Sequence, residues 1–150
     1  MTTLELTRED LRIIAGLARG HRIARIAADL DLTRYAVRDR VSRATTHLTL
    51  TGHPQPQLVD YAYRYGYLDR LTPEPREPIA ALPTRQAQCL DAVARGLSVA
   101  EIAVEQGVSF HTANTHRRTL YARLNARTRA HVVALGWQVG LLGEPARRGT

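Results

Sequence analysis

Lysine is absent from this sequence and cysteine occurs once, which excludes two common kinds of site at the outset. A single thiol, Cys89, cannot form a disulfide within the chain or build a cysteine-based zinc site. All 21 basic residues are arginines, and with 14 acidic residues they give a formal net charge of +7. A GC-rich genome would explain the missing lysine but not this excess of positive charge. Because arginine binds phosphate oxygens and guanine edges, the excess favours a polyanionic partner.

Long apolar runs, export signals and catalytic motifs are also missing. No stretch approaches the roughly 20 apolar residues of a membrane span, and the N-terminus lacks a basic segment followed by an apolar run. We therefore expect a protein of the bacterial cytoplasm, associated with the nucleoid and without a membrane partner. No phosphate-binding loop or nucleophile with a matching base is present, so we expect no enzyme activity, no cofactor and no metal. Cys89 is predicted to be a buried structural thiol.

An internal repeat divides the chain. Residues 6–48 align with residues 82–124 without a gap, and the three prolines between residues 73 and 78 oppose helix formation. The sequence predicts one unit at residues 1–68, a Pro-rich linker at 69–81, a second unit at 82–142 and a flexible tail at 143–150. The clearest matches between the copies are Ala18-Arg19-Gly20 with Ala94-Arg95-Gly96, Ile26-Ala27 with Ile102-Ala103, and Thr33 with Ser109.

Each unit has the sequence signals of a helix-turn-helix. Apolar residues recur at three and four positions in the first helix, and Thr7 with Asp10 forms a candidate capping box. A short helix follows, and Gly107, or Asp31 in the first unit, stands where the turn requires a positive φ. The next helix then begins after Ser109 or Thr33. The pattern predicts an all-α fold of two tandem four-helix helix-turn-helix units.

The second unit resembles the LuxR/GerE-type DNA-binding domain over its whole length. The resemblance implies that Asn114, Thr115 and Arg118 read bases, while Thr112 with Arg127 or Arg129 holds phosphates; His111 lies on the same polar helix. It also implies that the fourth helix, with Val133 and Trp137, forms a dimer interface. The segments that carry the resemblance are Leu82-Pro83-Thr84-Arg85-Gln86, Ala94-Arg95-Gly96-Leu97-Ser98, Glu101-Ile102-Ala103, Val108-Ser109, Thr112-Ala113-Asn114-Thr115-His116, Arg123-Leu124, Arg127-Thr128-Arg129-Ala130-His131 and Gly140-Leu141-Leu142.

Two departures from the family pattern concern individual side chains. The second unit has Gln86 where the family usually has a glutamate. In the first unit, Ala36 replaces the hydroxyl of Thr112, and Asp39 stands at a position that would face bases. Asp39 would either accept from a cytosine amino group or repel the DNA backbone. Because Arg34, Arg38 and Arg43 keep this helix basic, the first unit either reads different DNA or contacts protein.

Four tyrosines alternate near the end of the first unit. Tyr61, Tyr63, Tyr65 and Tyr67 would suit a strand, but alignment with the fourth helix of the second unit favours a helix with tyrosines on two faces. One of these faces would be exposed, which favours an interface with a partner; the alternative is an aromatic edge of the core.

The sequence therefore predicts a regulator of transcription that binds double-stranded DNA, as a small homodimer or an intramolecular pseudo-dimer. A connector of about a dozen residues can stretch roughly 40 Å, close to one turn of DNA, so one chain could reach two adjacent half-sites. The alternative function is a protein-interaction module that modulates another regulator through the tyrosines. Replacing the tyrosines would inactivate such a module, whereas Arg118→Ala would inactivate a DNA reader.

Overall fold

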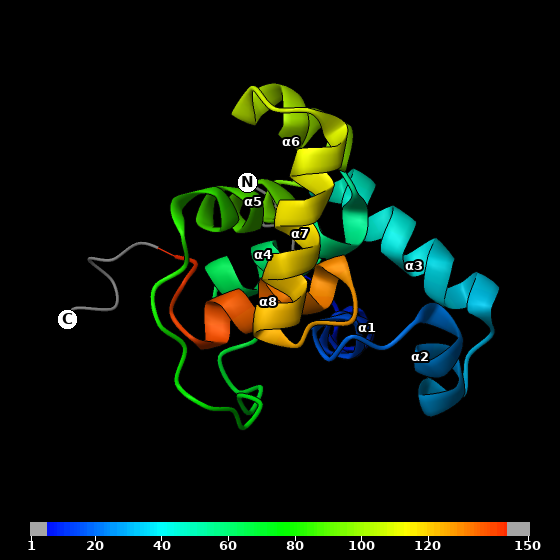
Figure 1. Ribbon diagram of the computed structural model, residues 1–150. Coiled ribbons are helices and arrows are strands. Elements are labelled where there is room, and N and C mark those ends of the chain that lie inside the picture. The colour runs from blue at the N-terminus through cyan, green and yellow to red at the C-terminus, as the bar shows by residue number, and fades with distance from the viewer. Residues whose placement is uncertain (1–5, 144–150) are drawn as a thin grey trace.

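The computed structural model describes residues 6–143, which contain eight helices and no strand (Figure 1). The all-α prediction is confirmed. None of the helices in this range is long and apolar enough to cross a membrane. The predicted tail lies outside the described residues except for Gly143. In chain order the helices are α1 (Arg8–Ala18), α2 (Ile23–Leu30), α3 (Arg34–His47), α4 (Pro54–Arg64), α5 (Thr84–Ala94), α6 (Val99–Gln106), α7 (Phe110–Leu124) and α8 (Arg129–Gln138).

Helix boundaries follow from short-range capping interactions. The Thr7 side chain accepts from the Asp10 backbone N–H and the Asp10 side chain accepts from Thr7, so the predicted capping box of α1 is confirmed. The turns after α2 and α6 both contain a left-handed residue, Asp31 with φ 56° and Gly107 with φ 68°. The sequence predicts a positive φ at both positions. Gly107 adopts it without a steric cost, and aspartate is one of the few other residues that tolerate it.

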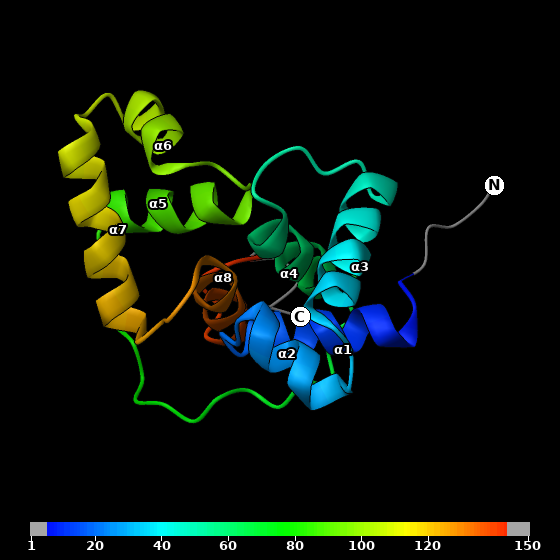
Figure 2. The same cartoon turned by 90° about the vertical axis from the view of Figure 1, so that its right-hand side faces the viewer.

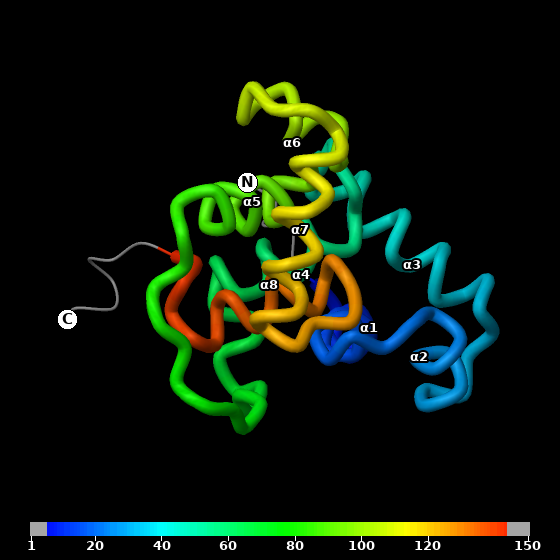
Figure 3. Tube along the Cα trace, in the orientation of Figure 1, coloured from blue at the N-terminus to red at the C-terminus, as the bar shows by residue number. Residues whose placement is uncertain are grey.

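Helices α4 and α8 pack against each other at the centre of the molecule, and α1 and α5 both contact this pair. The buried apolar side chains of all eight helices form one continuous core. In Figure 2, α3 and α7 lie on opposite sides of the molecule with α4 and α8 between them. The tube in Figure 3 shows the same path of the chain. Residues 6–71 and residues 82–143 therefore form a single body.

The connector after α4 is irregular from residue 72 to residue 83, as its prolines predict, but it is bound to the helices. Arg19 donates to the Thr72 carbonyl, and the Glu74 backbone N–H donates to Gln138 Oε1 at 2.9 Å. The Glu74 carboxylate also lies 2.9 Å from Nε2 of the buried His131. The connector therefore lies against the helices, and the two halves that it joins also contact each other directly.

A second set of hydrogen bonds joins the two halves near Gly96. The His53 backbone N–H donates to the Gly96 carbonyl at 2.9 Å, and Gln57 Nε2 donates to the Arg95 carbonyl at 2.8 Å. A Cβ atom on Gly96 would lie 2.6 Å from the Gln57 side chain, and Gly96 has φ 85°. This position therefore favours glycine for its backbone conformation, and a side chain here would displace Gln57 from its hydrogen bond to the Arg95 carbonyl.

Gly96→Ala tests this contact, with Gly107→Ala as its matched control. Both glycines have a positive φ, but a Cβ on Gly107 would meet no atom within 4 Å. We expect Gly107→Ala to lower the free energy of unfolding by about 1 kcal/mol, and Gly96→Ala to lower it by about 2 kcal/mol or more. Urea denaturation measures both. Equal losses would contradict a close contact between the halves at Gly96.

His131 predicts a pH dependence of stability. Its Nδ1 accepts from the Arg127 backbone N–H at 3.1 Å, so Nε2 carries the proton and donates to Glu74. Burial lowers the pKa of His131 below 6.5, against the opposing effect of Glu74. At mildly acidic pH, His131 therefore binds a proton more readily in the unfolded chain than in the folded chain. The free energy of unfolding should fall as pH drops from about 7 to about 5.5. His131→Gln should flatten this slope in urea denaturation; an unchanged slope would exclude His131 as a source of the pH dependence.

Candidate nucleic-acid interface

The second half of the chain presents one face of α7 to solvent. Ala113, Leu120 and Leu124 are fully buried, which fixes the helix with its opposite face outward. His111, Thr115 and Arg118 lie on this outer face and are exposed. We define these three residues as the α7 outer face.

Arg118 is the unpaired cation of this face. Its side chain has no hydrogen-bond or ion-pair partner among the described residues. The Thr115 hydroxyl, by contrast, donates to the His111 carbonyl within the helix at 3.0 Å. An unpaired guanidinium on an exposed helix has all of its donors available for an external acceptor such as a guanine edge.

Two other predicted contact residues of α7 already have partners. Arg117 donates to Asn114 Oδ1 from two nitrogens, at 3.2 and 2.9 Å, and lies over the ring of Tyr121. Asn114 therefore keeps its amide donors but shares its carbonyl oxygen. The Thr112 hydroxyl lies 3.0 Å from the hydroxyl of Ser109, the N-cap of α7, so it belongs to the cap of the helix.

Helix α3 has a different surface. Arg34, Tyr35 and Arg38 are exposed, and Tyr35 is 79% accessible. Arg43 is paired with Asp39, with Nε 3.0 Å from the carboxylate. This pair neutralises the one acidic group at the predicted base-facing positions, so Asp39 adds no net repulsion while Arg43 is bound to it. Arg34 and Arg38 remain without an ion-pair partner among the residues that the structure describes.

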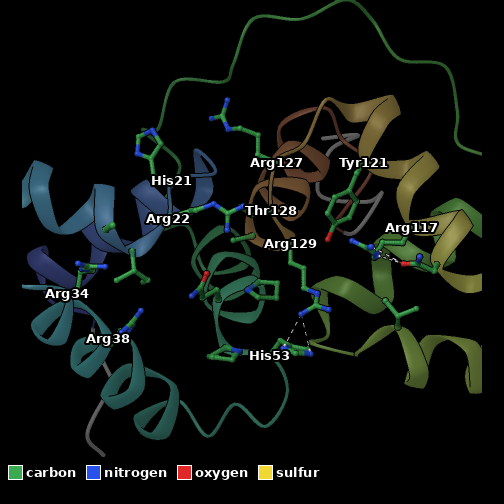
Figure 4. Close-up of a pocket in the computed structure, with 18 of the residues that line it drawn as sticks. His21, Arg22, Arg34, Arg38, His53, Arg117, Tyr121, Arg127, Thr128 and Arg129 are labelled. Carbon is green, nitrogen blue, oxygen red and sulfur yellow. Dashed lines mark hydrogen bonds between the residues drawn. The ribbon is translucent and has the colours of Figure 1, made fainter. Parts of the chain in front are cut away.

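A groove of about 870 Å³ runs between α3 and α7 (Figure 4). Arg34 and Arg38 line it from α3, and Asn114, Arg117 and Tyr121 line it from α7. The starts of α2, α4 and α8 form its floor. The groove contains no aspartate or glutamate among its lining residues, and its six arginines define what we call the arginine groove: Arg22, Arg34, Arg38, Arg117, Arg127 and Arg129.

The lining of the groove is positively charged. Burial lowers the pKa of His21, a further lining residue; Arg25, Arg127 and Arg19 add to this effect, and Asp29 opposes it. Arg129 lies 3.3 Å from the His53 ring, which points its guanidinium across the floor. Three helix N-termini also open here, since the N-caps of α2, α4 and α8 all line the groove: Arg22, His53 and Thr128. The site can therefore hold an anion.

Tyr63 and Trp137, two of the six residues predicted to form an interface, contact each other across the two halves of this one chain. Tyr63 stacks on Trp137, with ring centroids 6.0 Å apart, and Trp137 Nε1 donates to Asp60 at 2.9 Å. Val133 is fully buried in α8, so it cannot contact a second molecule as the folded chain stands. The other tyrosines form a separate cluster in which Tyr61 contacts Tyr65 and Tyr67. Tyr65 is 63% exposed.

Two further predictions concern cysteine and metal. Cys89 is buried, as predicted, and burial raises the pKa of its thiol to about 11, which leaves it protonated at neutral pH. Within residues 6–143, no three His, Cys, Asp or Glu side chains lie together in a way that could hold a metal ion.

The sequence did not single out Arg22, Arg117 or Tyr121. In the sequence, Arg22 is only the residue that precedes a short predicted helix. Arg117 is adjacent to Arg118, and the family resemblance indicated Arg118 alone. Their common position depends on how α4 and α8 pack, and local sequence patterns carry no signal for that packing. Only the excess of arginine over the whole chain indicated such a site.

Comparison with known proteins gives one match. Residues 80–135 match the model of the family described as bacterial regulatory proteins, luxR family (GerE). The matched segment contains α5, α6, α7 and most of α8, and the first half of the chain lies outside it. No curated protein and no solved structure matches the chain. The match supports DNA binding and regulation of transcription as the general role of this segment.

Proposed function

We propose that this protein is a sequence-specific regulator of transcription that reads double-stranded DNA with two helices, α3 and α7, held in one chain. The observation that carries the proposal is the α7 outer face: an unpaired Arg118 on an exposed helix that follows a tight turn. In a helix-turn-helix this helix enters the major groove, where its exposed side chains reach base edges. The family match covers this same helix.

The first half of the chain supplies the second reading helix in this proposal. Helices α1 to α4 follow the same order as α5 to α8, and α3 also begins after a left-handed residue and a capping hydroxyl. We regard this half as a divergent copy of the same unit. Its exposed Arg34, Tyr35 and Arg38 differ from the α7 residues at the matching positions, so the two helices should prefer different sequences.

The arrangement of α4 and α8 supports an intramolecular pseudo-dimer. These two helices stand at matching places in the two halves, and they bury their apolar faces against each other. A partner chain is therefore not needed to cover α8, and one chain can present two reading helices. We propose that occupancy of a promoter by this single body is the regulatory event.

Selection of random duplex DNA by the full chain tests the proposal. We expect an enriched motif with two unlike halves. Arg118→Ala should abolish the preference at one base pair of one half, at a cost of about 1–3 kcal/mol, and Arg38→Ala should weaken the other half. Arg123→Ala is the matched control, because Arg123 is exposed on the same helix but is turned away from the α7 outer face. Failure to enrich any motif would refute sequence-specific reading.

The second candidate function is an interaction module for another regulator. The specific observation in its favour is the cluster of Tyr61, Tyr65 and Tyr67, which leaves an exposed aromatic surface. A module of this kind predicts that Tyr65→Ala abolishes regulation while Arg118→Ala preserves it. A DNA reader predicts the reverse, so a reporter assay with both variants separates the two functions.

A further inference from the structure

The arginine groove has more positive charge than base reading by α7 requires. Arg22, Arg34 and Arg38 are exposed and have no ion-pair partner among the described residues, although many other arginines of the chain do have one. Arginines that are left unpaired beside one another repel, so their gathering in one groove is unfavourable for the isolated protein. The arrangement becomes favourable when a polyanion occupies the groove.

We propose that the arginine groove receives the sugar-phosphate backbone of the DNA that lies between the two sequences read by α3 and α7. This inference rests on the proposed function, because it takes the two helices as the reading elements. The groove has these helices as its two walls, so it lies between the two reading elements and can face the DNA that joins their sequences. The groove would then supply affinity and fix the position of the duplex, while the α7 outer face and the exposed side chains of α3 supply sequence preference.

The position of the charges favours an extended polyanion. Arg34 and Arg38 line one wall, Arg117 lines the other, and Arg22, Arg127 and Arg129 lie between them (Figure 4). Four of the six, Arg22, Arg34, Arg38 and Arg127, are exposed, so the groove does not enclose a compact anion. Duplex DNA carries one negative charge per about 1.7 Å of its axis, which provides phosphates along the whole width of such a groove.

The helix N-termini on the floor add to this charge. The backbone N–H groups at the start of α4 and α8 carry partial positive charge, and Thr128 caps α8 with its side chain accepting from the His131 N–H. Together with Arg129, whose guanidinium is directed by His53, the floor attracts the backbone without any group that distinguishes one base from another. The expected contribution is therefore independent of sequence.

The salt dependence of DNA affinity tests the groove directly. The double variant Arg22→Gln/Arg34→Gln removes two groove charges that have no intramolecular partner, and Arg12→Gln/Arg70→Gln removes two exposed arginines outside the groove. A random 40-bp duplex serves as the probe. The slope of log affinity against log salt should fall by about 0.9 for each groove arginine removed, and the control pair should keep the wild-type slope. Equal slopes for the two double variants would overturn the proposal.

Neutral phosphates locate the contact along the DNA. In a duplex that carries the selected motif, methylphosphonate linkages between the two half-sites should weaken wild-type binding and have a smaller effect on Arg22→Gln/Arg34→Gln. An equal effect on both proteins would show that the DNA backbone contacts a part of the protein other than Arg22 and Arg34, and would overturn the inference. The salt experiment needs no motif, so failure to select one would count against sequence reading alone. Thermal melting of both double variants should match the wild type, because neither pair of side chains holds the fold together.

Discussion

The contact between α4 and α8 determines the geometry of the rest of the molecule. It combines buried apolar surface with a small set of directed polar bonds: Trp137 donates to Asp60, Gln138 donates to Tyr63, and the rings of Tyr63 and Trp137 stack. Burial raises the pKa of Asp60, and the Trp137 donor and Arg64 oppose that rise. Because these bonds require one relative orientation of the two helices, they also fix where α3 and α7 stand.

The arginines divide into two groups by partner. Arg40, Arg43 and Arg95 are bound to carboxylates within the folded chain, and Arg95 bridges α5 to Glu105 at the end of α6. These pairs are exposed, so each contributes little to stability. Arg22, Arg34 and Arg38 in the arginine groove and Arg118 on the α7 outer face instead have no ion-pair partner among the described residues. Because no aspartate or glutamate lines the groove, its arginines are not neutralised there, which suits a polyanion.

Local features of the fold follow from local features of the sequence. The capping box at Thr7, the left-handed residue at Gly107 and the cap at Ser109 each depend on one or two residues, and their chemistry specifies a helix boundary directly. The helical reading of the tyrosine segment holds only up to Arg64, because Tyr65 caps α4 and Tyr67 lies beyond it.

Features that depend on contacts between distant residues could not be predicted from the sequence. The alignment of the repeat gave no information on how the two halves pack or on where the connector lies. The contacts of Glu74 with His131 and Gln138 join positions far apart in the sequence, and neither Glu74 nor Gln138 belongs to a motif. The arginine groove also depends on contacts between distant residues, because it exists only where α3, α7 and the starts of three other helices converge.

The most direct test of a single chain that presents two reading helices is the stoichiometry of its complex with DNA. Native mass spectrometry of the protein with a duplex that contains the full selected site gives the number of chains bound. The account predicts one chain on a site with two protected half-sites. Two chains on the same site, one for each half, would contradict it and show that the α4–α8 contact does not set the unit of recognition.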